Sequence, residues 1–264
     1  MAAQIAPTNI AVLLCGESGT GKEVLGRRIH SLSRYSDEPL HTIACGWMSA
    51  DRVADHFVQY SRPVEDELPP KTGTLFLDEP SDLDAASQSA LLRAIPDGET
   101  LQASGAIAPR LISSTTRDLV NETRQGRFPS ELYRRLSGIC FHLLPLRERR
   151  EDLPGLVQFL LAKHAARFQR PRPSLRTESL DALFQYAWPG NIRELENVIL
   201  RILVLEDEEL VISDLRFEPA LAETVAPPPH ASCTAAPAEV ERQLTLEALT
   251  RTARSANDRT GSPS

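Results

Sequence analysis

A glycine-rich turn between a short apolar run and a helix constrains the fold of this chain most strongly. Residues Ile10–Cys15 form the apolar run, and Lys22–Leu32 has apolar side chains at helical spacing. Between them, Gly16–Glu23 fits the pattern G-x-x-x-x-G-K, with Glu23 where a Ser or Thr usually contacts magnesium. A strand, a phosphate-binding loop and a helix are therefore expected. An ordinary glycine-rich turn is the alternative interpretation.

The chemistry of such a loop follows from its backbone. Glycines let successive N–H groups point at phosphate oxygens, and the following helix adds its positive end. Lys22 supplies a charge for the β- and γ-phosphates. The residues expected to bind nucleotide here are Gly16, Glu17, Ser18, Gly19, Thr20, Gly21, Lys22 and Glu23.

Further apolar runs indicate an α/β fold. Thr74–Leu77, Arg110–Thr116 and Ile139–Leu144 are expected strands, and Ser87–Ile95 is an expected helix that ends before Pro96. Continuous apolar runs separated by helices predict a parallel sheet covered on both faces, typical of a P-loop domain.

The chain changes character after Pro145. Three helices are expected and no strand, which predicts a small all-α domain: 151–167, 178–186 and Asn191–Leu205. Asn191 is the expected N-cap of the last helix, and Glu194 completes a capping box.

The C-terminal part is expected to contain little further folded structure. Residues 219–237 are rich in Pro and Ala and predict a linker, and Glu239–Thr252 predicts one amphipathic helix before a disordered tail. The expected division is an α/β domain over 1–147, a small helical domain over 148–217, a linker over 218–238 and a C-terminal helix with a disordered tail over 239–264.

The net charge, the cysteine spacing and the length of the apolar runs argue against several classes of protein. The 264 residues carry 29 Lys and Arg against 36 Asp and Glu, a net charge of −7 that argues against a broadly basic nucleic-acid surface. The four cysteines show no C-x-x-C spacing, so free thiols are favoured over disulfides or a metal site. The early apolar run is too short to span a membrane, and a cytoplasmic protein without membrane contact is expected.

An acidic pair completes the expected site. Asp78 and Glu79 follow the Thr74–Leu77 run, at the carboxyl end of an expected strand. Asp78 is expected to hold hydrated Mg²⁺, and Glu79 to orient or deprotonate an attacking water. A solvated acidic pair without function is the alternative.

With these motifs, the chain resembles the AAA+ domain of bacterial sigma-54-dependent activators, the enhancer-binding proteins, as a divergent and truncated member. The resemblance rests on Gly16–Glu23, Gly73–Glu79, Leu144–Arg149 with 151–153, and Trp188–Asn197, in that order. It implies an ATPase that binds ATP with Mg²⁺ and forms a ring. Glu at position 23 is typical of the family.

The resemblance also assigns roles to single residues. Arg193 corresponds to the lid arginine that reaches the nucleotide, Thr116 stands at the sensor position, and Arg135 at one arginine-finger position serving the neighbouring subunit. The other finger position is Pro129. The remaining arginines of these segments are interpreted as solvated or paired surface charges: Arg134, Arg147, Arg149 and Arg150.

Three departures from the family pattern limit the expected partners. No Gly-Ala-Phe-Thr-Gly-Ala loop occurs between Cys45 and Lys71, so contact with sigma-54 RNA polymerase is not expected. The asparagine that restrains the catalytic Glu in the family is Ala44 here. A recognition helix is missing, so this chain alone is not expected to bind DNA. Self-association into a ring, or a mixed ring with a related activator, is expected.

Three functions remain open from the sequence. The first is a ring-forming ATPase of the transcription-activator type. The second is a nucleotide-binding regulatory subunit that modulates a partner activator without remodelling sigma-54. The third, an autonomous DNA-binding repressor, would need a recognition helix that this sequence does not show.

Overall fold

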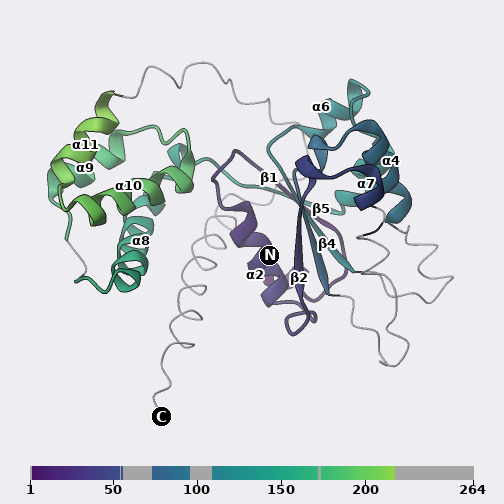
Figure 1. Cartoon of the computed structure of the whole chain (residues 1–264), viewed down its shortest axis with the longest axis horizontal. Coiled ribbons are helices and arrows are strands. Elements are labelled where there is room, and N and C mark those ends of the chain that lie inside the picture. The colour runs from purple at the N-terminus through teal and green to yellow at the C-terminus, as the bar shows by residue number, and fades with distance from the viewer. Residues whose placement is uncertain (1, 54, 56–72, 96–108, 172–173, 218–264) are drawn as a thin grey trace, which may run out of the picture. The chain divides into compact units, whose positions relative to one another are not determined.

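The computed structural model describes residues 2–53, 55, 73–95, 109–171 and 174–217 (Figure 1). The contacts divide them into a sheet unit, residues 2–16 and 25–142, and a helical unit, residues 17–24 and 143–217. The expected linker, the amphipathic helix at 239–252 and most of the segment between Cys45 and Lys71 lie outside the described residues. No helix within these ranges is long and apolar enough to cross a membrane.

The sheet unit contains five parallel strands in the order β2-β3-β4-β1-β5. Their bounds are Val12–Cys15 for β1, Leu40–Ala44 for β2, Thr74–Asp78 for β3, Arg110–Thr115 for β4 and Ile139–His142 for β5. The expected parallel sheet is confirmed. Strand β2 was not among the expected strands, because only Ile43 of its five residues is buried and its sequence has no apolar run.

Helices cover both faces of the sheet unit (Figure 1). Their bounds are Ala2–Ile5 for α1, Lys22–Ser31 for α2, Ala85–Ala94 for α4, Leu119–Arg124 for α6 and Ser130–Leu136 for α7. Leu75 and Leu77 of β3 join the core formed with α4 and α7. Phe76 points to the opposite face, where a side chain at Gly26 of α2 would collide with its ring. Neighbouring residues of one strand therefore anchor both helical layers.

The start of α4 shows why its observed bounds differ from the expected 87–95. The Asp84 carboxylate accepts a 2.7 Å hydrogen bond from the Ser87 backbone N–H. This N-cap satisfies a donor of the first turn, so the helix begins at Ala85.

The helical unit contains α8 (Leu153–Arg167), α9 (Thr177–Gln185), α10 (Asn191–Leu205) and α11 (Glu208–Phe217). The three expected helices are confirmed to within two residues, and α11 was not expected. Glu206 ends α10 in the left-handed region, and the Asp207 carboxylate accepts from the Leu210 N–H at the start of α11. Val211, Ile212 and Leu215 then pack into the core of this unit.

The expected capping role of Asn191 was wrong. Gly190 is the N-cap residue of α10, and Glu194 accepts a 2.8 Å hydrogen bond from its N–H. Asn191 has a φ of 54° and is fully buried, and its side chain bonds to other segments instead. Asparagine tolerates this left-handed backbone better than most residues do.

Candidate nucleotide-binding site

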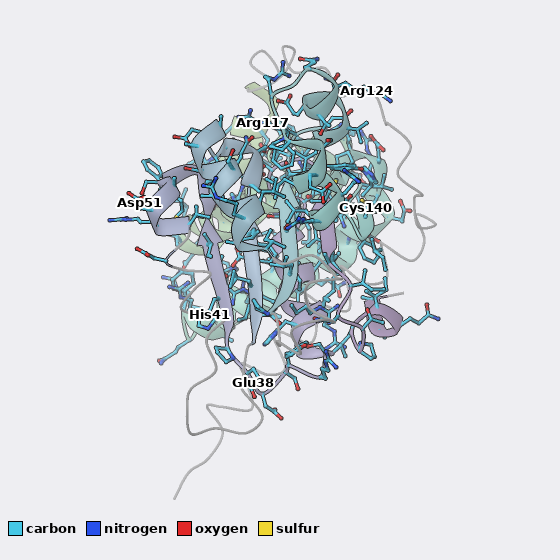
Figure 2. The ribbon with its side chains drawn as sticks, turned by 90° about the vertical axis from the view of Figure 1, so that its right-hand side faces the viewer. Glu38, His41, Asp51, Arg117, Arg124 and Cys140 are labelled. Atoms are coloured by element: carbon cyan, nitrogen blue, oxygen red, sulfur yellow. The ribbon has the colours of Figure 1, made fainter. Side chains whose placement is uncertain are left out.

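The acidic half of the candidate site lies at the carboxyl edge of the sheet. Asp78 is the last residue of β3 and Glu79 follows it. Figure 2 shows Arg117 just beyond β4 at this edge, whereas Glu38 and His41 lie at the opposite edge, at the start of β2. Ligands of parallel α/β sheets bind at the carboxyl edge. The sheet therefore places both carboxylates where a nucleotide site is expected.

The end of β4 holds both carboxylates. The Ser114 hydroxyl donates to Asp78 Oδ1 at 2.6 Å, and the Thr116 backbone N–H donates to Glu79 Oε2 at 2.9 Å. Glu79 has a φ of 52°, and its own N–H donates to the Ser114 carbonyl at 2.8 Å. It is therefore the backbone N–H of Thr116, the residue at the sensor position, that contacts Glu79. Non-glycine residues rarely adopt a φ like that of Glu79, and among the described residues Gln169, Trp188, Asn191 and Glu206 do so as well.

The residues present fit a magnesium ion held together with phosphates. In the described part of the chain, no cluster of three or more His, Cys, Asp or Glu side chains could hold a metal ion unaided. Mg²⁺ keeps several waters and binds one or two carboxylates plus substrate phosphates, so it needs no such cluster. Asp78, with one oxygen engaged by Ser114, is the carboxylate that can serve this purpose.

Cys45 lies just beyond β2, near the same acidic residues. Its side chain is buried, and burial raises the pKa of the thiol to about 12, with further contributions from the carboxylates of Asp78, Asp82 and Glu79. The thiol is therefore protonated at neutral pH and is chemically inert. It is a packing residue rather than a nucleophile.

The phosphate loop runs from β1 into α2. Gly16, Gly19 and Gly21 all have positive φ, as the tight turn requires. A side chain at Gly19 would collide with the Gly190 carbonyl oxygen. Lys22 opens α2, and its Nζ donates to the Glu17 carbonyl at 3.1 Å. The ammonium thus lies against the loop that is expected to bind phosphate.

Three carbonyl groups of the loop accept hydrogen bonds from the rest of the helical unit. The donors are Asn191 Nδ2 to Ser18 at 3.0 Å, Ile192 N to Gly19 at 2.9 Å and Arg149 Nη2 to Thr20 at 2.7 Å. These three hydrogen bonds hold the loop backbone from Ser18 to Thr20 in one conformation, and the Thr20 N–H donates to the Glu17 carbonyl within the loop at 3.4 Å.

Glu17 is held by two side chains of the helical unit. Arg147 donates to both of its carboxylate oxygens, at 2.8 and 2.6 Å, and Asn191 Nδ2 donates at 3.1 Å. The Arg147 hydrogen bond lowers the pKa of the Glu17 carboxyl, against an opposing effect of burial. Asn191 Oδ1 also accepts from the Leu146 N–H at 2.8 Å. Asn191 thereby connects the loop, the segment after Pro145 and α10.

The remaining expected loop and lid residues lie at the surface of the helical unit. Arg193 is exposed and donates from Nη1 to the Ser18 hydroxyl at 2.7 Å. Glu23 is exposed in the first turn of α2. Both side chains lie on or beside the phosphate loop.

Arg135 on α7 bonds within the sheet unit. Its guanidinium donates to the carbonyl oxygens of Leu92, at 3.0 Å, and Ile95, and it pairs with Glu131 at 3.3 Å. These carbonyls lie at the C-terminal end of α4, where a cation is favourable. Arg135 therefore has a stabilising contact in its own chain, which the resemblance did not imply.

Two arginines interpreted as surface charges have different roles in the structure. Arg149 is 2% exposed and binds the loop carbonyl of Thr20, so its interpretation as a surface charge was wrong. Arg147 is paired as expected, but with Glu17 of the phosphate loop. Sequence spacing could not show this, because 130 residues separate the two. Arg134 and Arg150 are exposed, and Arg134 pairs with Glu131.

The fold and these motifs define an AAA+ domain of the P-loop class with its helical lid. Residues 2–146 match the family described as the sigma-54 interaction domain, and residues 147–231 match the AAA+ ATPase lid domain. The chain belongs to the sigma-54 interaction domain family, among the AAA+ domains of sigma-54 activator-type transcription regulators.

Several relatives match most of the chain. It is 36% identical over 263 residues to the transcriptional regulatory protein ZraR of Klebsiella oxytoca, covering 94% of this chain and 59% of ZraR. It is 36% identical over 240 residues to the alginate biosynthesis transcriptional regulatory protein AlgB of Pseudomonas aeruginosa, covering 86% and 54%. The chain thus spans little more than half the length of these relatives.

Solved structures of NtrX from Brucella abortus share the fold. The ADP complex is 26% identical, with a TM-score of 0.66, and the match covers 98% of this chain and 65% of NtrX. The ATP complex is 27% identical, with a TM-score of 0.61, and the match covers 77% and 49%.

Proposed function

We propose that this chain binds ATP with Mg²⁺ and hydrolyses it in an oligomeric ring, as the ATPase part of a transcription regulator. One observation carries the proposal. The phosphate loop starts directly after β1, and Asp78 ends β3 with Glu79 directly after it. Both strands belong to one parallel sheet with their carboxyl ends at one edge. The complexes of NtrX with ATP and ADP support nucleotide binding.

The binding roles follow from charge and hydrogen-bonding capacity. The loop N–H groups and Lys22 hold the phosphates, and the first turn of α2 adds its positive end. Asp78 holds the magnesium ion, which when bound neutralises charge on the phosphate oxygens. Arg193, on the helical unit beside Ser18, contacts the nucleotide from the lid.

The hydrolytic roles fall on Glu79 and Arg135. Glu79 orients and deprotonates the attacking water, and its contact with the Thr116 N–H keeps the carboxylate in place before the reaction. Arg135 neutralises charge on the γ-phosphate of a neighbouring subunit. To do so, its guanidinium must exchange the carbonyls of Leu92 and Ile95 for phosphate oxygens.

An ATPase assay over a range of protein concentrations tests this proposal. Specific activity rises with concentration if rings form, and Glu79→Gln abolishes hydrolysis while nucleotide binding persists. Glu38→Gln, at the opposite edge of the sheet, is the matched control and keeps full activity. Binding without hydrolysis in the unchanged protein would instead indicate the regulatory subunit considered above.

One segment of the sequence limits the partners that we expect for this ATPase. The segment between Cys45 and Lys71 lacks the Gly-Ala-Phe-Thr-Gly-Ala loop and has Val64-Glu-Asp-Glu-Leu-Pro-Pro70 instead, with three carboxylates and two prolines. We therefore expect this chain to act on sigma-54 RNA polymerase only in a mixed ring with a related activator. ATP-dependent promoter melting with this protein as sole activator would contradict that expectation.

A further inference from the structure

Ser114 and Asp78 are paired across adjacent strands. They are register partners in the parallel β3–β4 ladder, so their side chains project on the same face of the sheet. The Ser114 hydroxyl donates to Asp78 Oδ1 at 2.6 Å, and Ser114 is fully buried. Hydrogen bonds from a hydroxyl to a carboxylate at this length are among the stronger ones in proteins. The sheet itself therefore sets the orientation of the Asp78 carboxylate.

The hydrogen bond from Ser114 makes the two carboxylate oxygens of Asp78 unequal in their surroundings. Oδ1 is engaged by the buried hydroxyl, and the rotation of the group about its χ2 bond is restrained. We propose that Ser114 is a positioning residue that presents Asp78 Oδ2 to magnesium. The inference rests on the proposed function, in which Asp78 is the metal carboxylate. Partners that orient a ligating carboxylate typically change metal affinity by about 10- to 100-fold when removed.

The neighbouring serine provides a matched control. Ser113 precedes Ser114 on β4 and is 1% exposed, so its side chain is equally buried but projects from the opposite face. Its hydroxyl makes no hydrogen bond among the described residues. Ser113→Ala and Ser114→Ala therefore remove the same atom from the same strand, and only the second loses a contact with Asp78.

The test measures how magnesium strengthens nucleotide binding. A fluorescent ADP analogue is titrated into the full chain at a series of Mg²⁺ concentrations, for the unchanged protein, Ser114→Ala, Ser113→Ala and Ser114→Thr. The half-saturating Mg²⁺ concentration should rise about tenfold or more in Ser114→Ala. It should stay unchanged in Ser113→Ala and return toward the original value in Ser114→Thr, which keeps the hydroxyl. Affinity for the analogue without Mg²⁺ should not change.

Each other result overturns the inference. Equal magnesium dependence in Ser114→Ala and the unchanged protein would show that the hydroxyl does not position Asp78. Equal shifts in Ser113→Ala and Ser114→Ala, or a loss of affinity that appears without Mg²⁺, would indicate a general packing role. Absence of magnesium-dependent binding in the unchanged protein would contradict the proposed function itself, and the inference with it.

Discussion

Arg147 binds both carboxylate oxygens of Glu17, through Nη1 at 2.8 Å and Nη2 at 2.6 Å. The two residues are 130 positions apart, one in the phosphate loop and the other in the short helix η3 (Leu146–Glu148) that opens the lid. Such bidentate ion pairs fix both the distance between the two side chains and their relative orientation. The conformation of the loop at Glu17 therefore depends on the first turn of the lid.

A double-mutant cycle measures this dependence. Glu17→Gln and Arg147→Met should each lower the free energy of unfolding by about 1–2 kcal/mol, because each leaves a half-buried charged partner without its main contact. The double variant should lose less than the sum, with a coupling of about 1 kcal/mol. Thermal unfolding measures both. Arg134→Met, which removes an exposed pair on α7, is the control and should change stability by less than about 0.5 kcal/mol. Additive losses would show that the pair is not coupled.

The same pair predicts a pH dependence. Arg147 keeps the pKa of the Glu17 carboxyl below its ordinary value. A carboxyl with a lowered pKa in the folded state stabilises the fold above the unfolded pKa, about 4.3, and this contribution disappears as the pH falls through the lower value. The Tm difference between the unchanged protein and Arg147→Met should be constant near neutral pH and narrow below about pH 4. A difference that persists in acid would mean that another contact of Arg147 dominates.

Lys22→Ala should weaken ATP and ADP binding at least about tenfold, a loss of about 1.4 kcal/mol or more. The variant removes the only ammonium expected at the phosphates, whereas the N–H groups of the loop remain. Binding is measured by isothermal titration calorimetry in the presence of Mg²⁺. Lys163→Ala removes the same charge from the surface of α8, where it pairs with Glu196, and should leave affinity unchanged. Equal affinities in the two variants would rule out the proposed role of Lys22.

Mixing two inactive variants distinguishes a role of Arg135 in a neighbouring subunit from its role within the chain. Arg135→Ala alone should lose both hydrolysis and some thermal stability, because the carbonyls of Leu92 and Ile95 lose their donor. The Glu79→Gln variant retains Arg135, but its own nucleotide site lacks the carboxylate that activates water. If Arg135 acts across subunits, ATPase activity should reappear in the mixture. A mixture of Glu79→Gln with Lys22→Ala has no intact site in either chain and should stay inactive. No recovery in the first mixture would leave Arg135 with its structural role alone.

The thiol of Cys45 should be unreactive in the folded protein. With a pKa of about 12, only roughly one thiol in ten thousand is ionised at pH 8, and the group is buried as well. Iodoacetamide labelling followed by peptide mass spectrometry should show Cys45 unmodified until denaturant is added. The half-buried Cys15 and Cys140 serve as internal comparisons. Labelling of Cys45 in the native protein at the rate of an exposed thiol would contradict the burial.

Local sequence patterns were sufficient for the main elements of the fold. Apolar runs identified β1, β3, β4 and β5, and helical spacing identified α2, α8 and α10. Most of these elements bury the greater part of their apolar side chains, whereas in β5 only Phe141 is buried. The edge strand β2 was not identified, because only Ile43 of its five residues is buried, and α11 was not identified although Val211, Ile212 and Leu215 pack into the core.

In the candidate site, too, the sequence identifies the motif residues, whereas only the tertiary structure identifies their partners. Gly16–Lys22 and the Asp78–Glu79 pair are identifiable from the sequence, because backbone turns and strand ends need particular residue types at fixed spacing. The partners of these residues are not identifiable in that way. Ser114 meets Asp78 only through the register of two strands, and Arg147, Arg149 and Asn191 meet the phosphate loop only when the lid segments fold against it. Hydrogen bonds between residues over a hundred positions apart are decided by tertiary packing, since no local pattern records which side chains the fold brings together.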